Sequence, residues 1–468
     1  MPVGDLAPEL AVLVTAVLVL LLAMFIPQRW HGLCAALALA GLAVAALIAV
    51  AQFDAHRLTF SGTFALDAAT GAARVMILTV TALCVLLSPG WFASDRRHGE
   101  VYAMLLFSTL GAMAMAGAAD LMQLVIGVLL SSITGYVLAA YHRDWAISVE
   151  AGMKYFLIGA LANALMVIGV VLVLGMTGST GYAGLKGAAL KGAALTDALA
   201  LVGLMLVLIG LLFKLGAMPA HTWVPDVAEG APAPAAAFLT TVPKIAAAIA
   251  LIRLVALFPP EGALRLLIAL IAAATMTLGN LAALWQDDVR RLIGWSSVSQ
   301  AGYALMAVAV VGLSGEALPA LIVFIGAYAL ATLTAFAVVT HLRGRTGLGG
   351  YAGLLRQQPL AAAALCVAFL SLVGIPPLVG FLGKFALFLA AIEGGYAWLA
   401  LLAVANSVLS LFYYARVIAP MIFQPAADAP ETLDRRSKAV MVVAAAALVL
   451  LPVAGGLIWP SLPVGLLP

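Results

Sequence analysis

The chain has 468 residues, of which 65% are hydrophobic and 9% charged, and its mean hydropathy is +1.16. An ordinary soluble domain is about a quarter charged, so this composition excludes a soluble enzyme and indicates a lipid bilayer as the solvent. The formal net charge of +3 is too small to indicate a nucleic-acid partner.

Transmembrane helices are predicted along almost the whole chain. A hydrocarbon core of roughly 30 Å requires about 20 apolar residues in a helix. The start, "MPVGDLAPEL", lacks the basic segment of a signal peptide and no cleavage site follows it, so the first apolar run is predicted to be a retained span. The fourteen predicted spans cover residues 9–26, 31–52, 75–92, 101–118, 120–140, 150–176, 197–222, 232–257, 264–285, 294–313, 317–341, 360–392, 396–420 and 437–459.

Basic residues are concentrated in alternate loops between these spans. Thirteen lie in the odd-numbered loops and five in the even-numbered ones. Short cytoplasmic loops retain Lys and Arg, so both termini are predicted on the periplasmic side. The longest connections, near 53–74 and 177–196, are short and rich in Gly, Ala and Thr, which leaves no room for a soluble catalytic domain.

The three cysteines do not indicate a redox or metal site. Cys34, Cys84 and Cys366 are scattered inside apolar runs, without the pair spacing of a disulfide, a metal site or an iron–sulfur site. Packing in the apolar interior is the favoured interpretation.

Four lysines lie well inside predicted spans: Lys154, Lys214, Lys244 and Lys384. A lysine at mid-membrane costs on the order of 2.5–3.5 kcal/mol on insertion scales. Snorkelling to the interface explains Lys154, a few residues into its span, and Arg253 near a span end. For the other three lysines a function is favoured over a misplaced boundary.

Helix-breaking residues accompany these lysines. The run 360–392 is too long for one membrane helix, and the sequence "LVGIPPLVGFLGKF" supplies the interruption before Lys384. Interrupted helices at corresponding places in two halves of a chain indicate a transport site near the midplane, here in spans four to eight and nine to thirteen; ordinary proline kinks are the alternative. The predicted breaks are Gly216, Pro219, Pro243, Gly374, Pro376 and Pro377.

Other polar groups are candidates for proton relay. His221 lies beside a break, where a neutral imidazole either passes protons or caps a loop. Ser297, Gln300 and Tyr303 lie on one helical stretch, where such groups either join helices or hold a water chain. Glu150 and Lys154 are four residues apart in the favourable order for a helical ion pair.

Three segments resemble signature segments of a known family, the antiporter-like membrane subunits of NADH–quinone oxidoreductase (respiratory complex I), which belong to the proton-conducting membrane transporter superfamily. They are "FKLGAMPAHTWVPDVAEGAPAP", "GNLAALWQDDVRRLIGWSSVSQAGY" and "GIPPLVGFLGKF". "EAGMKYFLIGAL", the lysine at 384 and the fourteen-span length resemble the subunit N family in particular. The resemblance extends from about residue 100 to 420, and multisubunit cation/proton antiporters and membrane-bound hydrogenases share the fold.

The resemblance implies an all-α polytopic protein with two inverted five-helix repeats and broken helices 7 and 12. It implies proton translocation along Lys214, Lys244 and Lys384, with Glu150 and Lys154 as the sixth-span pair. It also implies a subunit of an NADH:quinone translocase in the bacterial inner membrane, with other membrane-arm subunits and the quinone pool as partners. FMN, iron–sulfur clusters and quinone are expected in other subunits. The expected units are 1–100, 101–257 (first repeat), 258–420 (second repeat) and 421–468.

The chain departs from the family pattern at two positions. Leu129 stands where the family usually has a fifth-span glutamate that pairs with the seventh-span lysine, and Gln300 stands where it has a histidine. Either Glu150 replaces the missing acid, or water and neutral groups suffice, or this chain does not pump in the standard way. A proton-translocating subunit is predicted; the alternatives are a cation/proton antiporter subunit, a hydrogenase subunit or a non-pumping scaffold.

Overall fold

Helices make up most of the computed structural model, which describes residues 2–95, 97–190, 198–260, 262–425, 432–458 and 466–467. Arg96, Lys191 and the predicted span ends at residues 197 and 459 lie outside these residues. The α-helices are α1 (Ala7–Phe25), α2 (Gly32–Ala51), α3 (Ala68–Trp91), α4 (His98–Ala116), α5 (Leu121–Ala139), α6 (Ala146–Thr177), α7 (Tyr182–Leu190), α8 (Ala198–Leu215), α9 (Trp223–Gly230), α10 (Ala233–Leu239), α11 (Val242–Val255), α12 (Ala263–Ala283), α13 (Val289–Val310), α14 (Ala317–His341), α15 (Leu354–Gln357), α16 (Pro359–Val373), α17 (Val379–Glu393), α18 (Ala397–Phe423) and α19 (Arg435–Ile458). Three short 3-10 helices, η1 (Val3–Leu6), η2 (Gln28–Trp30) and η3 (Leu348–Tyr351), and the strands β1 (Arg57–Thr59) and β2 (Phe64–Leu66) complete the described elements.

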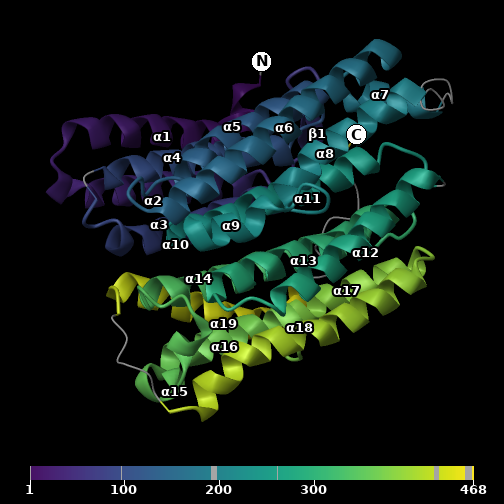
Figure 1. The fold of residues 1–468 in the computed structure, drawn as a ribbon. Helices are drawn as coiled ribbons and strands as arrows, with labels where there is room; N and C mark the ends of the chain where they lie inside the picture. The colour runs from purple at the N-terminus through teal and green to yellow at the C-terminus, as the bar shows by residue number, and fades with distance from the viewer. Residues whose placement is uncertain are drawn as a thin grey trace.

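The long helices run in roughly one direction and form a multi-pass membrane protein (Figure 1). The elements from α1 to α11 form the purple-to-teal half, and those from α12 to α19 form the green-to-yellow half. Outward-facing side chains such as Phe25 and Leu401 are 81% and 73% exposed, as suits contact with lipid. The apolar window of the segment Ala233–Val255, which contains α10 and α11, is entirely buried. This segment is therefore shielded from lipid by the surrounding helices.

The number of membrane spans in the described residues differs from the predicted fourteen. Twelve helices are long and apolar enough to cross a membrane. The predicted span 360–392 is divided into α16 and α17, each of 15 residues. The predicted span 294–313 lies in the 22-residue α13, whose hydroxyl and amide side chains lower its hydropathy. Fourteen spans and inverted repeats thus remain a prediction, whereas the helical membrane fold is confirmed.

Two helices are interrupted in the same way. α8 ends before Gly216 and α16 ends before Gly374, and both glycines have positive φ angles, 72° and 92°. The amide of the next residue donates back across the end of the helix, from Ala217 to the Leu212 carbonyl (2.9 Å) and from Ile375 to the Leu370 carbonyl (3.1 Å). This is a Schellman-type helix end, which favours glycine because a side chain is strained at that φ. A cis X–Pro bond follows each glycine.

Each half of the protein also contains a close contact between two helices at a glycine, and the two contacts resemble each other. A Cβ atom on Gly111 would lie 2.5 Å from the Ser131 amide nitrogen, where α4 meets α5. A Cβ atom on Gly279 would lie 2.5 Å from the Ser299 amide nitrogen, where α12 meets α13. Glycine permits the two backbones to approach this closely in each pair.

Two connections that the sequence shows only as Gly-, Ala- and Thr-rich contain regular structure. β1 and β2 form an antiparallel ribbon in the first, with Leu58 paired to Ala65. The ribbon is held to the protein because Ala65 donates to the Gly117 carbonyl and Ala119 donates to the Thr63 carbonyl, both at 2.8 Å. The second connection contains α7. Tertiary hydrogen bonds, which composition does not reveal, order the ribbon.

The odd-numbered loops gather at one end of the molecule. Gln28 in the first loop donates to the Asp95 carbonyl in the third. Trp91, the last residue of α3 before the third loop, donates to His142 in the fifth loop (3.2 Å), and Arg343 of the eleventh loop lies over the Trp91 ring. The loops that carry most basic residues therefore share one end of the helix bundle.

Arg253 forms a buried ion pair. It was expected to snorkel, but its side chain and that of Asp67 are both 0% exposed, with Nη1 2.6 Å from Oδ2. Arg253 also donates to Thr70 and to the Leu467 carbonyl, while the Leu467 amide donates to Asp67. The pair thus joins the start of α3 to α11, and the correction follows from a carboxylate that lies 186 residues away in sequence.

Removing one partner of this pair is expected to be far more damaging than removing both. Arg253→Met leaves the Asp67 carboxylate buried and uncompensated, which costs about 3–5 kcal/mol. The double variant Arg253→Met/Asp67→Leu should recover much of that loss. The measurement is the thermal unfolding midpoint of the detergent-extracted protein. Arg29→Ala, which removes an exposed arginine, is the matched control and should leave the midpoint unchanged. Equal losses in the single and double variants would contradict the expectation.

Candidate functional site

Three of the predicted lysines are buried in the interior. Lys214, Lys244 and Lys384 are 0%, 1% and 3% exposed. Each lies beside a helix interruption: Lys214 in the last turn of α8, Lys244 in the first turn of α11, and Lys384 in α17 after the break. No carboxylate in the described residues forms an ion pair with any of them, so their hydrogen bonds go to neutral groups.

Lys214 lies in an aromatic environment at the end of α8. Its Nζ donates to Ser131 of α5 at 3.5 Å, and the rings of Tyr155 and Phe213 are 5.9 and 5.7 Å away. Tyr155 stacks on Trp223 with centroids 4.3 Å apart. The weak hydrogen bond and the ring faces stabilise an ammonium group less than a carboxylate does.

Lys244 donates to a backbone carbonyl of the other half of the protein. Its Nζ lies 2.7 Å from the Ser297 carbonyl in α13. The preceding residues Thr240 and Thr241 separate α10 from α11, and Pro243 occupies the first turn of α11. The interruption therefore places the Lys244 amine at the contact between α11 and α13.

Lys384 lies at the edge of a cavity of about 270 Å³. Its Nζ donates to the Val373 carbonyl (3.1 Å) and to Ser407 (3.2 Å), and it lies 4.1 Å from the centre of the Tyr303 ring. Apart from Lys384 and Ser407, the cavity is lined by apolar residues, several of them exposed on the outer surface: Phe385, Val404, Val408 and Leu411.

Hydroxyl groups lie between Lys244 and Lys384. Ser297, whose carbonyl accepts from Lys244, has its hydroxyl 2.7 Å from that of Tyr328. Tyr328 and Gln300 line a small cavity of about 10 Å³ that also contacts Lys384. A space of that size holds about one water molecule. The structure thus brings Ser297 and Gln300 between the two lysines, and Tyr303 against Lys384.

The two break glycines make room for lysine side chains. A Cβ atom on Gly216 would lie 3.1 Å from Lys244 Nζ and 2.6 Å from the Val224 side chain. A Cβ atom on Gly374 would lie 3.0 Å from Lys384 Cδ. Each glycine therefore both ends a helix and admits a lysine to the interrupted backbone.

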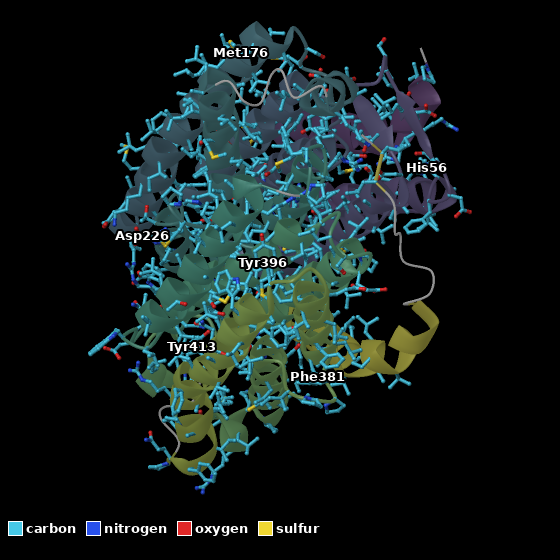
Figure 2. The ribbon with its side chains drawn as sticks, turned by 90° about the vertical axis from the view of Figure 1, so that its right-hand side faces the viewer. His56, Met176, Asp226, Phe381, Tyr396 and Tyr413 are labelled. Carbon is cyan, nitrogen blue, oxygen red and sulfur yellow. The ribbon has the colours of Figure 1, made fainter. Side chains whose placement is uncertain are left out.

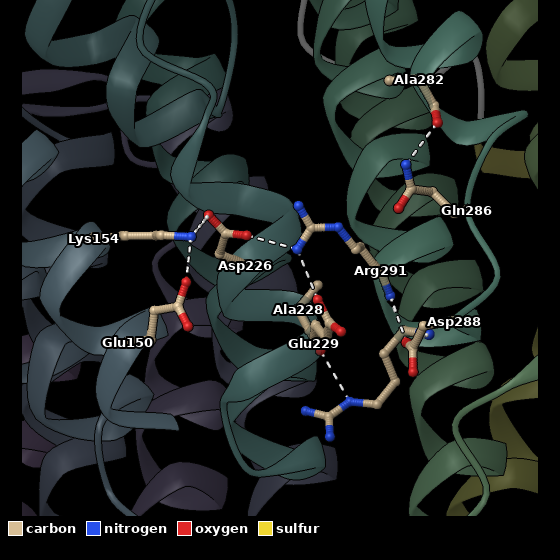
Figure 3. Close-up of polar contacts among 10 residues, drawn as sticks. Glu150, Lys154, Asp226, Ala228, Glu229, Ala282, Gln286, Asp288 and Arg291 are labelled. Atoms are coloured by element: carbon tan, nitrogen blue, oxygen red, sulfur yellow. Dashed lines mark hydrogen bonds and ion pairs between the residues drawn. The ribbon is translucent and has the colours of Figure 1, made fainter. Parts of the chain in front are cut away.

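A separate group of acidic and basic side chains forms a chain of ion pairs (Figure 3). Lys154 lies 2.7 Å from Glu150 and 3.2 Å from Asp226, and Arg291 lies 2.6 Å from Asp226 and 2.7 Å from Glu229. These residues come from α6, α9 and α13, so the chain of ion pairs joins the two halves. Figure 2 shows Asp226 at the edge of the molecule.

The ion-pair chain decides one question that the sequence left open. The side chain of Glu150 is 62% exposed and is paired with Lys154, which is 44% exposed. Glu150 is therefore not the partner of the fully buried Lys214. Asp226 and Glu229 were not predicted as site residues. The predicted seventh span ends at residue 222, whereas the structure has a further short helix, α9, which extends to Gly230.

His221 lies in the interruption between α8 and α9 and is 7% exposed. Its ring centroid is 5.8 Å from that of Trp295. In the described residues, His221 Nδ1 and Trp295 Nε1 are both buried without a hydrogen-bond partner. His221 is thus close to the break, but no hydrogen bond of its ring joins it to a lysine there.

No group of three or more His, Cys, Asp or Glu side chains in the described part of the chain could hold a metal ion. The buried amines, hydroxyls and water-sized space can instead hold and pass protons.

Comparison with known proteins gives a consistent result. Residues 118–410 match the family described as NADH:quinone oxidoreductase/Mrp antiporter, TM. NADH-quinone oxidoreductase subunit N from Mycobacterium sp. (strain JLS) is 44% identical over 435 residues, covering 92% of each chain. A chain of respiratory complex I from Thermus thermophilus with bound aureothin has a TM-score of 0.85 and 32% identity, covering 98% of this chain and 100% of that one. A chain of the Mrp complex from Dietzia sp. DQ12-45-1b (TM-score 0.86, 22% identity, covering 98% of this chain and 96% of that one) shares the fold.

Gly216→Ala is expected to disturb both the helix end and Lys244. The new Cβ meets Val224 and the Lys244 amine, and the φ of 72° strains a residue with a side chain. We expect a thermal midpoint several degrees lower. Gly175→Ala is the control, because nothing lies within 4 Å of its Cβ position. An unchanged midpoint for Gly216→Ala would show that the close approach is not required.

Proposed function

Because the chain belongs to the NADH:quinone oxidoreductase/Mrp antiporter family, we propose that it is the proton-translocating membrane-arm subunit N of an NADH–quinone oxidoreductase. Quinone reduction by NADH takes place in other subunits, which hold FMN, the iron–sulfur clusters and quinone. The partners of this chain are the other membrane-arm subunits and the lipid bilayer. The protein lies in the bacterial inner membrane.

One observation carries the proposal: three amines are buried in interrupted helices and contact only neutral groups. A lysine that lacks a carboxylate partner is costly to bury in its charged form, because desolvation disfavours the ammonium ion. Its proton affinity therefore responds readily to a neighbouring charge. This property is required of a group that takes up and releases protons in turn.

The contacts support a route along the lysines. Gly216, two residues after Lys214, lies against the Lys244 amine. From Lys244, the Ser297 and Tyr328 hydroxyls and the small cavity lead to Lys384. In the proposed mechanism a proton from the cytoplasm reaches Lys214, passes Lys244 and leaves through Lys384. Charges about 8 Å apart at an effective dielectric of about 20 interact by about 2 kcal/mol, so each lysine can bias the next.

The orientation of the protein forms part of the proposal. The basic loops that share one end of the bundle are placed in the cytoplasm by the charge bias. Both termini then lie on the periplasmic side. The matched interruptions and matched glycine contacts support two repeats, 101–257 and 258–420, flanked by 1–100 and 421–468.

The lysine route is tested by reconstituting the whole complex in sealed vesicles. Lys244→Ala and Lys384→Ala should each lower the number of protons moved per NADH oxidised at least twofold, because each variant removes one lysine from the proposed proton route. Lys186→Ala, outside the interior, should keep the wild-type yield. Wild-type yields in both interior variants would show that the lysines do not carry the proton.

The variant Leu129→Glu tests whether the chain is a proton-pumping subunit or a non-pumping scaffold. Leu129 is partly buried in α5 and stands where the family usually has a glutamate that pairs with the seventh-span lysine. Restoring an acid at this position is expected to change the proton yield of a working pump, since a nearby carboxylate raises the proton affinity of a lysine. Leu129→Gln is the uncharged control. If the yield responds to neither variant and to neither lysine change, the chain is a scaffold. A yield that depends on Na⁺ or K⁺ would instead indicate a cation/proton antiporter.

A further inference from the structure

A polar stripe on α18 was not among the predicted site residues. In "ANSVLSLFYYAR", residues 405–416, the polar side chains Asn406, Ser407, Ser410, Tyr413 and Tyr414 follow helical spacing on one face. All but Ser407, which is partly buried, are at most 3% exposed. The opposite face carries lipid-exposed residues such as Phe412, which is 61% exposed. The stripe therefore faces the protein interior.

The stripe begins at Lys384. The Ser407 hydroxyl accepts a hydrogen bond from Lys384 Nζ at 3.2 Å and lies 3.0 Å from the Tyr303 hydroxyl. Ser410 donates to the Ser407 carbonyl at 2.6 Å, one turn further along the helix. The Ser407 and Tyr303 hydroxyls, each able to donate and accept, thus meet beside the buried amine.

The stripe continues through a network with α12. Asn280 donates to the carboxamide oxygen of Asn406 at 2.9 Å, and Tyr413 donates to the Asn280 carboxamide oxygen at 3.0 Å. Asn406 donates to Thr277 at 3.1 Å. Figure 2 shows Tyr413 and Phe381, which lines the Lys384 cavity, among the helices of the C-terminal half. From Ser407 to Tyr414 the helix rises about 10 Å at 1.5 Å per residue.

The stripe ends at the surface, at the end of the bundle that carries the basic loops. Arg416, two residues beyond Tyr414, is 38% exposed and pairs at 2.8 Å with Asp287, which is 87% exposed. Asp287 lies in the ninth predicted loop. The stripe therefore spans the distance from a buried lysine to an exposed ion pair.

The opposite direction along α17 offers no such groups. The next acid after Lys384 is Glu393 at the end of α17, and the eight residues between them, 385–392, are all apolar. Glu393 accepts a hydrogen bond from Ser314. The described hydrogen bonds form two groups between Lys384 and the basic end of the bundle, one around Ser407 and Tyr303 and one around Asn406, Asn280 and Tyr413, and no such group follows Lys384 along α17 toward the other end.

We propose that Asn406, Ser407, Ser410 and Tyr413, with Asn280 and Tyr303, form a second proton-uptake branch that joins the cytoplasmic end of the protein to Lys384. This rests on the proposed pumping function, and it lets Lys384 be loaded without passage through Lys214. A hydroxyl on the branch accepts a proton on its oxygen and releases its own to the next group, so the branch keeps its charge and Lys384 gains one proton. The asparagine amides do not titrate; they hold the hydroxyls and intervening water in line.

If the polar residues of α18 only held helices together, the variants would give a different result from the one expected for a proton-uptake branch. Polar groups join membrane helices, and a purely structural role would lower the amount of assembled complex without changing the protons moved per NADH in the complex that remains. The ratio, measured per assembled complex, therefore separates the two roles.

The test uses the whole complex in sealed vesicles, with Tyr413→Phe and Asn406→Leu as variants. We expect both to lower the protons moved per NADH oxidised by at least a third, and Asn406→Gln, which keeps a neutral carboxamide, to retain most of the yield. Phe412→Leu, on the lipid face of the same turn, is the matched control and should keep the wild-type ratio. Lys244→Ala is measured in parallel.

An unchanged ratio in Tyr413→Phe and Asn406→Leu, with or without loss of assembly, overturns the branch. If Lys244→Ala then still lowers the ratio, the lysine route stands and only the α18 branch is wrong. If Lys244→Ala also leaves the ratio unchanged, the proposed route through Lys244 is wrong as well.

Discussion

The structure depends on one constraint: a polar group in the hydrocarbon layer must find its partner inside the protein. Backbone groups that are freed where α8 and α16 end are satisfied by Schellman-type hydrogen bonds, and side chains of the surrounding helices cover the open turns. The entirely buried α10–α11 segment follows from the same requirement. The interruption between α10 and α11 is shielded from lipid by the surrounding helices, whereas the break between α16 and α17 lies at the surface of this chain, where Pro376 and Pro377 are exposed.

The distribution of charge partners divides the molecule into two environments. At the end of the bundle and around α3, basic side chains meet carboxylates, as in Arg291 with Asp226 and Arg253 with Asp67. In the interior, Lys214, Lys244 and Lys384 meet hydroxyls, carbonyls and aromatic rings. Ion pairs fix the charge of their members, whereas neutral partners leave an amine free to change its protonation. The fold thus separates groups that hold helices together from groups that can exchange protons.

α9 has a particular place in this arrangement. It packs against α6 of the first half and α13 of the second, and Asp226 on this helix bridges Lys154 and Arg291. α9 also follows directly on the interruption beside Lys214. A shift of α9 would therefore displace both the chain of ion pairs and the backbone beside the buried lysines. In this way α9 physically connects the two environments.

The sequence was sufficient for features that are strongly local. Apolar run lengths predicted most helices, and the Gly and Pro residues before Lys384 predicted where a long run divides. It was not sufficient where partners come from distant segments. The β1–β2 ribbon, the pairing of Arg253 with Asp67 and the role of Asp226 depend on contacts between residues far apart along the chain. The α18 stripe was visible as helical spacing of Asn406, Ser410 and Tyr413, but aromatic and small polar residues are common in membrane helices, so the pattern alone did not identify it.

The glycine at each interruption has a consequence for substitution by arginine. The space beside Gly216 and Gly374 is matched to a slender aliphatic stem and a compact ammonium head. A planar guanidinium is broader than an ammonium group and needs several hydrogen-bond acceptors around its plane. It also does not release its proton in proteins. Arginine at position 244 or 384 would therefore preserve the formal charge while losing both the fit and the chemistry, so charge conservation is a poor guide to which replacements these positions tolerate.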